Sequence, residues 1–213
     1  MILEERMQVY LDSLDTGNTL FLENMEKEAR MEGVPVIRKS TQRFIKTLLA
    51  EKKPRRVLEV GTAIGFSTLL ICEYGPAELS VVTIENYEKR IPLARENFRR
   101  AGREEQITLL CGDAEKILPS LEGEFDLIFM DAAKGQYIHW LPQIKRLLPE
   151  GGVLLSDNVL QEGDILESHF LVERRNRTIY KRMREYLFAI THDPELSTTV
   201  LPIGDGLSYT VRL

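Results

Sequence analysis

Two aspartates and one asparagine each follow a short apolar run, and together they could bind a metal cation. Asp131 closes the run 125–130, and Asp157 and Asn158 close the run 152–156. Such runs predict buried strands of a parallel sheet, and ligands bind outside the carboxyl ends of these strands. Carboxylate and amide oxygens are the ligands that Mg²⁺ and Ca²⁺ prefer. The pattern therefore indicates a cation site, although a turn cap at Asp157-Asn158 and a helix start at Asp131 are also ordinary roles for these residues.

Residues 57–67 run as an apolar strand into a glycine turn and then into the start of a helix. Gly61 and Gly65 would let a ligand approach the backbone closely, and the helix expected near Thr68 would offer free N–H groups. The spacing departs from the dinucleotide fingerprint, because its last glycine comes one residue early. The turn is therefore compatible with nucleotide binding and equally with any strand-to-helix connection.

The ends of the next two strands add polar groups in the order that a nucleoside site would need. Glu85 ends the second strand and could hold ribose hydroxyls. Asp113 and Ala114 follow the third strand, where a short polar turn could contact the edge of an adenine ring. Glu85 could equally belong to the start of the next helix.

The arrangement of apolar runs predicts an α/β fold with a doubly wound, Rossmann-like sheet that is mostly parallel. The strands are expected at 57–60, 79–84, 107–111, 125–130 and 153–156, and the helices near Thr68, Arg95, Glu115 and Ile144. Two further strands, 198–202 and 207–213, are joined by Gly204-Asp205-Gly206 and should form an antiparallel C-terminal pair, which makes seven strands. We expect one domain over 1–213, with an N-terminal helical region at 1–53 and a cofactor- and metal-binding core at 54–213.

The composition is that of an ordinary globular protein, with 43% hydrophobic and 29% charged residues. No apolar stretch is long enough to predict a membrane span. The two cysteines, Cys72 and Cys111, lie far apart in apolar surroundings, which favours a reduced, cytoplasmic protein over a disulfide or a thiolate metal site. A net charge of −5 gives no general attraction to nucleic acid, so such binding would need a local basic surface.

A charged helix expected over 173–190 could provide that surface. One side carries basic residues at helical spacing, namely Arg174, Arg177, Lys181 and Arg184, with Arg175 and Arg182 beside them. The opposite side carries Ile179, Met183, Tyr186, Leu187 and Ile190. This is either an amphipathic helix with a solvated basic side or a phosphate-binding surface for nucleic acid, which Arg38, Lys39, Arg43 and Lys46 could extend.

The motifs together resemble a known enzyme family over about residues 35–213. Residues 58–65, with Glu85, resemble the S-adenosylmethionine-binding half of class I methyltransferases. Residues 131–134, 157–160 and 201–206 are similar to the cation-dependent O-methyltransferases, which include catechol and caffeoyl-coenzyme A O-methyltransferases. Within that family, residues 131–137 and the arginine-rich helix are most similar to the bacterial tRNA 5-hydroxyuridine methyltransferases.

The resemblance implies a role for each motif. For S-adenosylmethionine, it implies binding of the methionine part by Glu59, Gly61 and Ser67, of the ribose by Glu85, and of the adenine edge by Asp113 and Ala114, with Asp131 also beside the cofactor. For Mg²⁺, it implies the ligands Asp131, Asp157 and Asn158, with Lys134 as the catalytic lysine beside Asp131. It supplies no counterpart for the further acidic residue that catechol-type members place beside the second substrate hydroxyl.

Methyl transfer from a sulfonium needs an aligned, nucleophilic oxygen. A divalent cation lowers the pKa of a coordinated hydroxyl, after which Lys134 could accept its proton. Tyr137 shares one helix side with Trp140 and either packs in the core or, being close to Lys134 in sequence, contacts a substrate ring. The expected substrate is 5-hydroxyuridine at the tRNA wobble position, whose hydroxyl and neighbouring carbonyl can chelate one cation, with the anticodon loop bound by Arg174, Arg175, Arg177 and Lys181. The alternatives are a small catechol-like phenol as substrate, an NAD-dependent oxidoreductase, or a non-catalytic RNA-binding module. We also expect a homodimer.

Overall fold

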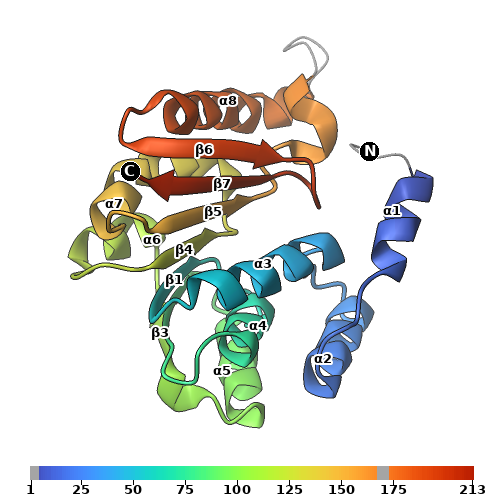
Figure 1. Cartoon of the computed structure of the whole chain (residues 1–213). Coiled ribbons are helices and arrows are strands. Elements are labelled where there is room, and N and C mark those ends of the chain that lie inside the picture. Colours follow the sequence, from blue (N-terminus) through green and yellow to red (C-terminus); the bar gives the residue numbers. More distant parts are fainter. Residues whose placement is uncertain (1–4, 167–172) are drawn as a thin grey trace.

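A seven-stranded mixed sheet forms the centre of the protein (Figure 1), which confirms the predicted fold. The computed structural model describes residues 5–166 and 173–213. The strand order is β3-β2-β1-β4-β5-β7-β6, in which β7 runs antiparallel to both β5 and β6 and the other neighbours are parallel. The strands are β1 (Arg56–Val60), β2 (Ser80–Glu85), β3 (Ile107–Cys111), β4 (Leu127–Met130), β5 (Val153–Asp157), β6 (Leu196–Leu201) and β7 (Leu207–Arg212).

Helices cover both faces of this sheet (Figure 1). One core cluster joins α2, α3, α4 and α5 to one face, and a second joins α6, α7 and α8 to the other. Strands β1, β4 and β5 are buried almost throughout, because both of their faces are covered. The helices are α1 (Glu5–Ser13), α2 (Leu20–Met31), α3 (Lys39–Lys52), α4 (Phe66–Tyr74), α5 (Ile91–Arg100), α6 (Ala114–Ile117), α7 (Tyr137–Leu147) and α8 (Arg177–His192). No helix among the described residues is both long and apolar enough to cross a bilayer.

Most strand boundaries differ from the sequence prediction by one or two residues, and two differences, one in a helix and one in a strand, have a visible cause. The late helix begins at Arg177 instead of residue 173, because Arg174–Asn176 form a tight 3-10 turn (η5) in which the Asn176 N–H bonds to the Glu173 carbonyl. Strand β4 begins at Leu127, since Asp126 turns its carboxylate toward the backbone N–H groups of Arg55 and Arg56. The Asp126 side chain thus binds the backbone at the start of β1, and Asp126 itself is not part of β4.

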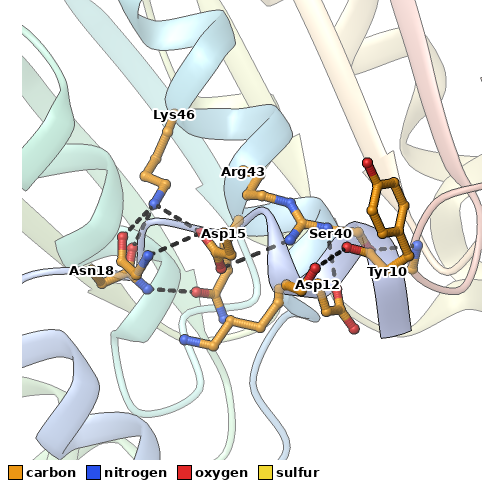
Figure 2. Close-up of polar contacts among 12 residues, drawn as sticks. Tyr10, Asp12, Asp15, Asn18, Ser40, Arg43 and Lys46 are labelled. Carbon is orange, nitrogen blue, oxygen red and sulfur yellow. Dashed lines mark hydrogen bonds and ion pairs between the residues drawn. The ribbon is translucent and has the colours of Figure 1, made fainter. Parts of the chain in front are cut away.

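The segment between α1 and α2 is fastened to α3 by charged side chains (Figure 2). Lys46 donates to the Gly17 carbonyl at 2.8 Å and to the Asn18 side chain at 3.2 Å, and it lies 3.8 Å from the Asp15 carboxylate. Arg43 pairs with Asp12 at 3.1 Å. These contacts neutralise basic groups that the sequence placed on an extended nucleic-acid surface.

The other basic residues of that proposed extension are also paired. Lys39 lies 2.9 Å from the Glu23 carboxylate and 2.8 Å from that of Glu26. Arg38 lies 4.0 Å from Asp205. Acidic partners distant in sequence thus pair with the four cations that could extend the basic surface, and that extension stays a prediction.

Candidate active site

A cavity of about 710 Å³ lies at the carboxyl ends of β1, β2, β3, β4 and β5. Parallel strands that end at one edge bring together side chains from segments far apart in sequence. The predicted site residues that line the cavity are Gly61, Glu85, Asp113, Ala114, Asp131, Lys134, Asp157 and Asn158. The structure therefore joins the predicted nucleoside end and the predicted cation end in a single cavity.

The turn after β1 packs so tightly against the end of β4 that only glycine fits there. The φ angle of Gly61 is +106°, and a Cβ on this residue would lie 2.1 Å from the Asp131 carbonyl oxygen. The Asp131 N–H also bonds to the Val60 carbonyl at 2.9 Å. The floor of the cavity is thus fixed where the two strands end.

The Glu85 carboxylate organises the nucleoside end. It accepts backbone hydrogen bonds from Ala63 at 2.7 Å, Asn86 at 3.0 Å and Tyr87 at 2.8 Å, and the residue is only 7% exposed. These contacts hold the glycine turn against the end of β2. The same carboxylate lines the cavity, so it is placed where it could also accept from ribose hydroxyls.

The third strand contributes a capped helix start. Asp113 is the N-cap of α6, and its side chain accepts from the Glu115 N–H at 3.0 Å. Ala114 is buried directly behind it. Both residues line the cavity, and the small side chain of Ala114 leaves room there for a flat ring.

Glu59 is fully buried in the middle of β1, behind the cavity lining. Its Oε2 accepts hydrogen bonds from Thr68 and from Thr83, whereas Oε1 has no hydrogen-bond partner among the described residues. Burial raises the pKa of Glu59 to about 7, an effect that the hydroxyls of Ser67, Thr68 and Thr83 only partly offset. A buried carboxylate oxygen without a partner suits the cationic amino group of the methionine part of the cofactor. The cofactor roles of Glu59 and Ser67 remain predictions.

The raised pKa of Glu59 gives a test that needs no substrate. The folded protein holds the Glu59 proton more tightly than the unfolded chain, so the free energy of unfolding should fall as pH rises from about 4.5 to about 7. The loss should be on the order of 3 kcal/mol. Glu59→Gln should remove it, making the cofactor-free variant more stable than the parent above about pH 7. Urea unfolding across this range measures the difference, and parallel curves for the two proteins would contradict the assignment.

Asp131 and Lys134 form a close ion pair at the reaction end of the cavity. The Lys134 Nζ lies 2.6 Å from the Asp131 Oδ1 and 3.3 Å from the Tyr137 hydroxyl. Burial lowers the pKa of Lys134, but Tyr137, Asp131 and Asp157 together outweigh it and raise that pKa above its ordinary value. Lys134 is therefore a cation in this arrangement. It becomes able to accept a proton only when another positive charge near the carboxylates lowers its pKa.

Asp157 and Asn158 follow directly at the end of β5. The Asp157 carboxylate is 3% exposed and accepts from the Asn158 N–H at 2.9 Å, while Asn158 takes a left-handed conformation with φ of +58°. Burial and the nearby Asp131 raise the pKa of Asp157 to about 7. Two carboxylates that repel each other in a buried place would be relieved by a bound divalent cation.

The donor set at this end suits a hard cation. Within residues 5–166 and 173–213, no three histidine, cysteine, aspartate or glutamate side chains gather as metal ligands. A cation here would thus use the Asn158 amide oxygen beside the carboxylates of Asp131 and Asp157. Oxygen donors of this kind, with room left for water or substrate, fit Mg²⁺ better than zinc.

Several residues that the sequence did not single out for the site also line the cavity. Arg38, from the α2–α3 linker, and Asp205, from the β6–β7 loop, lie on the acceptor side. Trp140 lines it too, with an indole N–H that is buried and has no partner among the described residues. The sequence presented Asp205 as a turn residue between glycines, and no local signal placed it near Asp157, whose pKa it helps to raise.

Tyr137 does not line the cavity, and of the two roles expected for it the structure shows core packing. Its side chain is fully buried, and its hydroxyl donates to the Met130 carbonyl at 3.0 Å. Its ring packs edge-on against Tyr186, with centroids 5.5 Å apart. It is the first residue of α7, directly after the 3-10 turn Lys134–Gln136 (η3), and its side chain packs in the core.

The predicted RNA-binding residues of η5 and α8 lie outside the cavity lining. Arg174, Arg175 and Lys181 are exposed, and Arg175 and Lys181 pair only with the nearby, exposed Glu173 and Glu185. Such surface pairs contribute little and would yield to a phosphate.

The other basic residues of α8 have structural roles. Arg182 donates to the Gly135 carbonyl at 3.2 Å, and Arg184 donates to the Ile165 carbonyl at 3.1 Å. Ile179, predicted on the apolar side, is 38% exposed, whereas Met183, Tyr186 and Ile190 on that side are buried as predicted. The basic surface is therefore smaller than the sequence predicted.

Comparison with known proteins relates this chain to O-methyltransferases. A family model described as O-methyltransferase matches residues 15–213. The catechol O-methyltransferase of Mycobacterium tuberculosis is 34% identical over 163 residues, which cover 75% of this chain and 74% of that protein. Caffeoyl-CoA O-methyltransferase 1 of Eucalyptus globulus is 28% identical, covering 80% and 72%. A Podospora anserina methyltransferase with bound S-adenosylhomocysteine superposes with a TM-score of 0.88 at 26% identity, covering 98% of this chain and 94% of that one.

Proposed function

Because this chain belongs to the O-methyltransferase family, we propose that its cavity methylates a hydroxyl group held by a divalent cation beside S-adenosylmethionine. The observation that carries the proposal is the arrangement of the cavity. Glu85, Asp113 and Ala114 line one end, whereas Asp131, Lys134, Asp157 and Asn158 line the other. A cofactor bound at the first end would direct its methyl group toward an acceptor at the second.

The residues of this chain would each do part of the work. Glu85 would hold the ribose, and the unpartnered Glu59 oxygen would receive the cofactor's amino group. Asp131, Asp157 and Asn158 would hold Mg²⁺, which lowers the pKa of the acceptor hydroxyl and fixes its position when bound. Lys134, which pairs with Asp131 as an ammonium, would first lose a proton to water when a cation bound by the carboxylates lowers its pKa, and the neutral amine would then accept the hydroxyl proton at Nζ. S-adenosylmethionine would supply the methyl group: an O–C bond to the acceptor would form as the C–S bond breaks, and the sulfonium would leave as a neutral thioether.

For the substrate, we propose 5-hydroxyuridine at the tRNA wobble position, giving 5-methoxyuridine. Its hydroxyl and adjacent carbonyl present two oxygens to one cation, as a catechol does. A wobble base lies in a single-stranded loop and can be splayed into a cavity. The basic surface formed by the exposed Arg174, Arg175 and Lys181 and the half-buried Arg177, here called the basic patch, would bind the flanking phosphates.

A small catechol-like phenol is the alternative substrate. Asp205 supports it, because this carboxylate lies on the acceptor side of the cavity, where it could accept from a second hydroxyl. The similarity to a catechol O-methyltransferase points the same way. This alternative uses the same cation and the same lysine but gives the basic patch no role.

One assay separates these possibilities. Purified protein with labelled S-adenosylmethionine and Mg²⁺ would be given either bulk tRNA that carries 5-hydroxyuridine or a set of catechols, and the products would be identified by mass spectrometry. We expect 5-methoxyuridine. Methylation of catechols alone would favour the small-phenol alternative. Binding of tRNA without any methylation would favour a non-catalytic RNA-binding module, and binding of NAD with hydride transfer would favour an oxidoreductase.

We also propose that the protein is a homodimer that pairs through its N-terminal helices. Met7, Tyr10 and Leu14 are each more than half exposed on one side of α1 and just beyond its end, and α1 lies at the edge of the molecule (Figure 1). Exposed apolar groups at helical spacing are commonly covered by a partner. Sedimentation at micromolar concentration should therefore show a dimer, and replacing these three residues by glutamate should give a monomer. A parent protein that sediments as a monomer would exclude this assembly.

A further inference from the structure

The hydroxyl of Tyr137 forms hydrogen bonds with groups at the ends of both β4 and β5. These strand ends carry Asp131 and Asp157 at the reaction end of the cavity. It lies 3.0 Å from the Met130 carbonyl and 3.2 Å from the Ala132 N–H, which flank Asp131. It also lies 3.4 Å from the Asp157 carbonyl and 3.3 Å from the Lys134 Nζ. One buried oxygen thus contacts the backbone beside both acidic residues and the side chain of the lysine.

The hydrogen-bonding capacity of a phenol is fully used in this arrangement. A tyrosine hydroxyl donates one hydrogen bond and accepts up to two. Here it accepts from the Ala132 N–H and from the Lys134 ammonium, and it has one proton for the carbonyls of Met130 and Asp157. If the oxygen were removed, a backbone N–H would lose its partner and Lys134 would keep only Asp131.

The ring of Tyr137 is held as firmly as its hydroxyl. The residue is fully buried, Tyr186 packs against it edge-on at 5.5 Å, and Trp140 lies 6.3 Å away. Because neighbouring side chains fix the ring, the hydroxyl position is set by the core and not by the cavity contents. A group fixed in this way can impose geometry on the more exposed Lys134.

From these contacts we propose that Tyr137 is a positioning residue: its hydroxyl fixes the spacing between the ends of β4 and β5 and holds Lys134 over Asp131. The inference rests on the proposed function, because it takes Lys134 to accept the proton that the acceptor hydroxyl releases. Tyr137 itself contacts neither substrate nor cofactor. It acts through Lys134 and through the backbone beside the two carboxylates.

The test is Tyr137→Phe, which removes the oxygen and keeps the ring. We expect kcat to fall about ten- to a hundredfold, the effect of losing a hydrogen bond to a charged group, while the KM for S-adenosylmethionine stays within about twofold. In the metal-free, cofactor-free protein, acylation of Lys134 by acetic anhydride should become several-fold faster, as quantified on the Lys134 peptide by mass spectrometry. The affinity for Mn²⁺, followed by paramagnetic resonance, should fall because the carboxylates are held less firmly.

Tyr186→Phe is the matched control. Tyr186 is equally buried, and its hydroxyl pairs with the Ser156 side chain at 2.6 Å instead of with Lys134. It should lose stability in the same way but keep the parent kcat and Lys134 reactivity. If both variants lose stability alike and Tyr137→Phe keeps the parent values of kcat, Lys134 acylation and Mn²⁺ affinity, Tyr137 is only a core residue and the inference fails.

Two further measurements keep the outcome clear. If Tyr137→Phe does not fold, replacing Tyr137 by 3-fluorotyrosine weakens the phenol as an acceptor while keeping the ring, and a parent-like kcat and acylation rate would then overturn the inference. If no acceptor is methylated by the parent protein, the proposed function fails, whereas Lys134 acylation and Mn²⁺ binding still report on Tyr137.

Discussion

Asp157→Ala should abolish methyl transfer while leaving the affinity for S-adenosylmethionine within about twofold. The expected loss in kcat is at least about a thousandfold, because a cation that activates a hydroxyl contributes several kcal/mol to the transition state. Asp157 lies at the reaction end of the cavity, whereas Glu85 and Asp113 line the nucleoside end. Single-turnover assays with labelled cofactor and calorimetry with unlabelled cofactor measure the two effects separately.

Asp157→Asn is the matched control, since it keeps the shape of the side chain and removes only its charge. It should lose nearly as much activity as the alanine variant if the carboxylate binds a cation. EDTA should likewise stop the parent enzyme, and added Mg²⁺ should restore it. Full activity in EDTA would exclude the metal mechanism. An equal loss of cofactor binding and activity in a folded Asp157→Ala variant would contradict the division of the cavity into two ends.

Replacing Arg174, Arg175 and Arg177 by glutamate should reduce methylation of tRNA by at least about tenfold and spare cofactor binding. These residues belong to the basic patch, outside the cavity lining, so the cation and cofactor residues stay untouched. The slope of tRNA affinity against salt should fall by about one for each phosphate contact that is lost. Filter binding at several salt concentrations, beside the methylation assay, measures both effects.

A matched charge change elsewhere distinguishes a specific surface from a general effect of charge. Lys52, Lys53 and Arg55 are exposed near the amino end of β1, whereas the cavity lies at its carboxyl end. Replacing these three residues by glutamate changes the net charge by the same amount as the first triple variant. That variant should methylate tRNA almost as the parent does. Equal losses in both triple variants would mean that the basic patch has no special role, and normal tRNA methylation by the first variant would exclude the patch as the RNA-binding surface.

The sequence was sufficient to predict the sheet because its strands are short apolar runs separated by amphipathic helices. The ends of those runs also located Asp131, Asp157 and Asn158, since side chains that follow parallel strands must meet at one edge. The ends of strands were less predictable where a polar side chain accepts hydrogen bonds from the backbone of a neighbouring segment. Asp126 does this just before β4.

Contacts between distant segments could not be predicted. Arg38 and Asp205 line the same part of the cavity, yet nothing in either local sequence indicates the other. The sequence gives no clear reason to expect the 3-10 turn Lys134–Gln136 directly before the buried Tyr137. The pairing of Arg43 and Lys46 with acidic residues before α2 likewise became visible only in three dimensions (Figure 2).

The polar contacts between the start of α3 and the β6–β7 loop affect when the protein becomes active during its synthesis. The Gly204 N–H bonds to the Ser40 hydroxyl at 2.9 Å, and Arg38 pairs with Asp205 across the cavity mouth. One wall is therefore built from two segments that are 164 residues apart in sequence. A nascent chain that has exposed every predicted cofactor and cation residue still lacks that wall until the β6–β7 loop has left the ribosome. Stalled chains of increasing length should thus gain activity in one late step, after residue 205 has emerged.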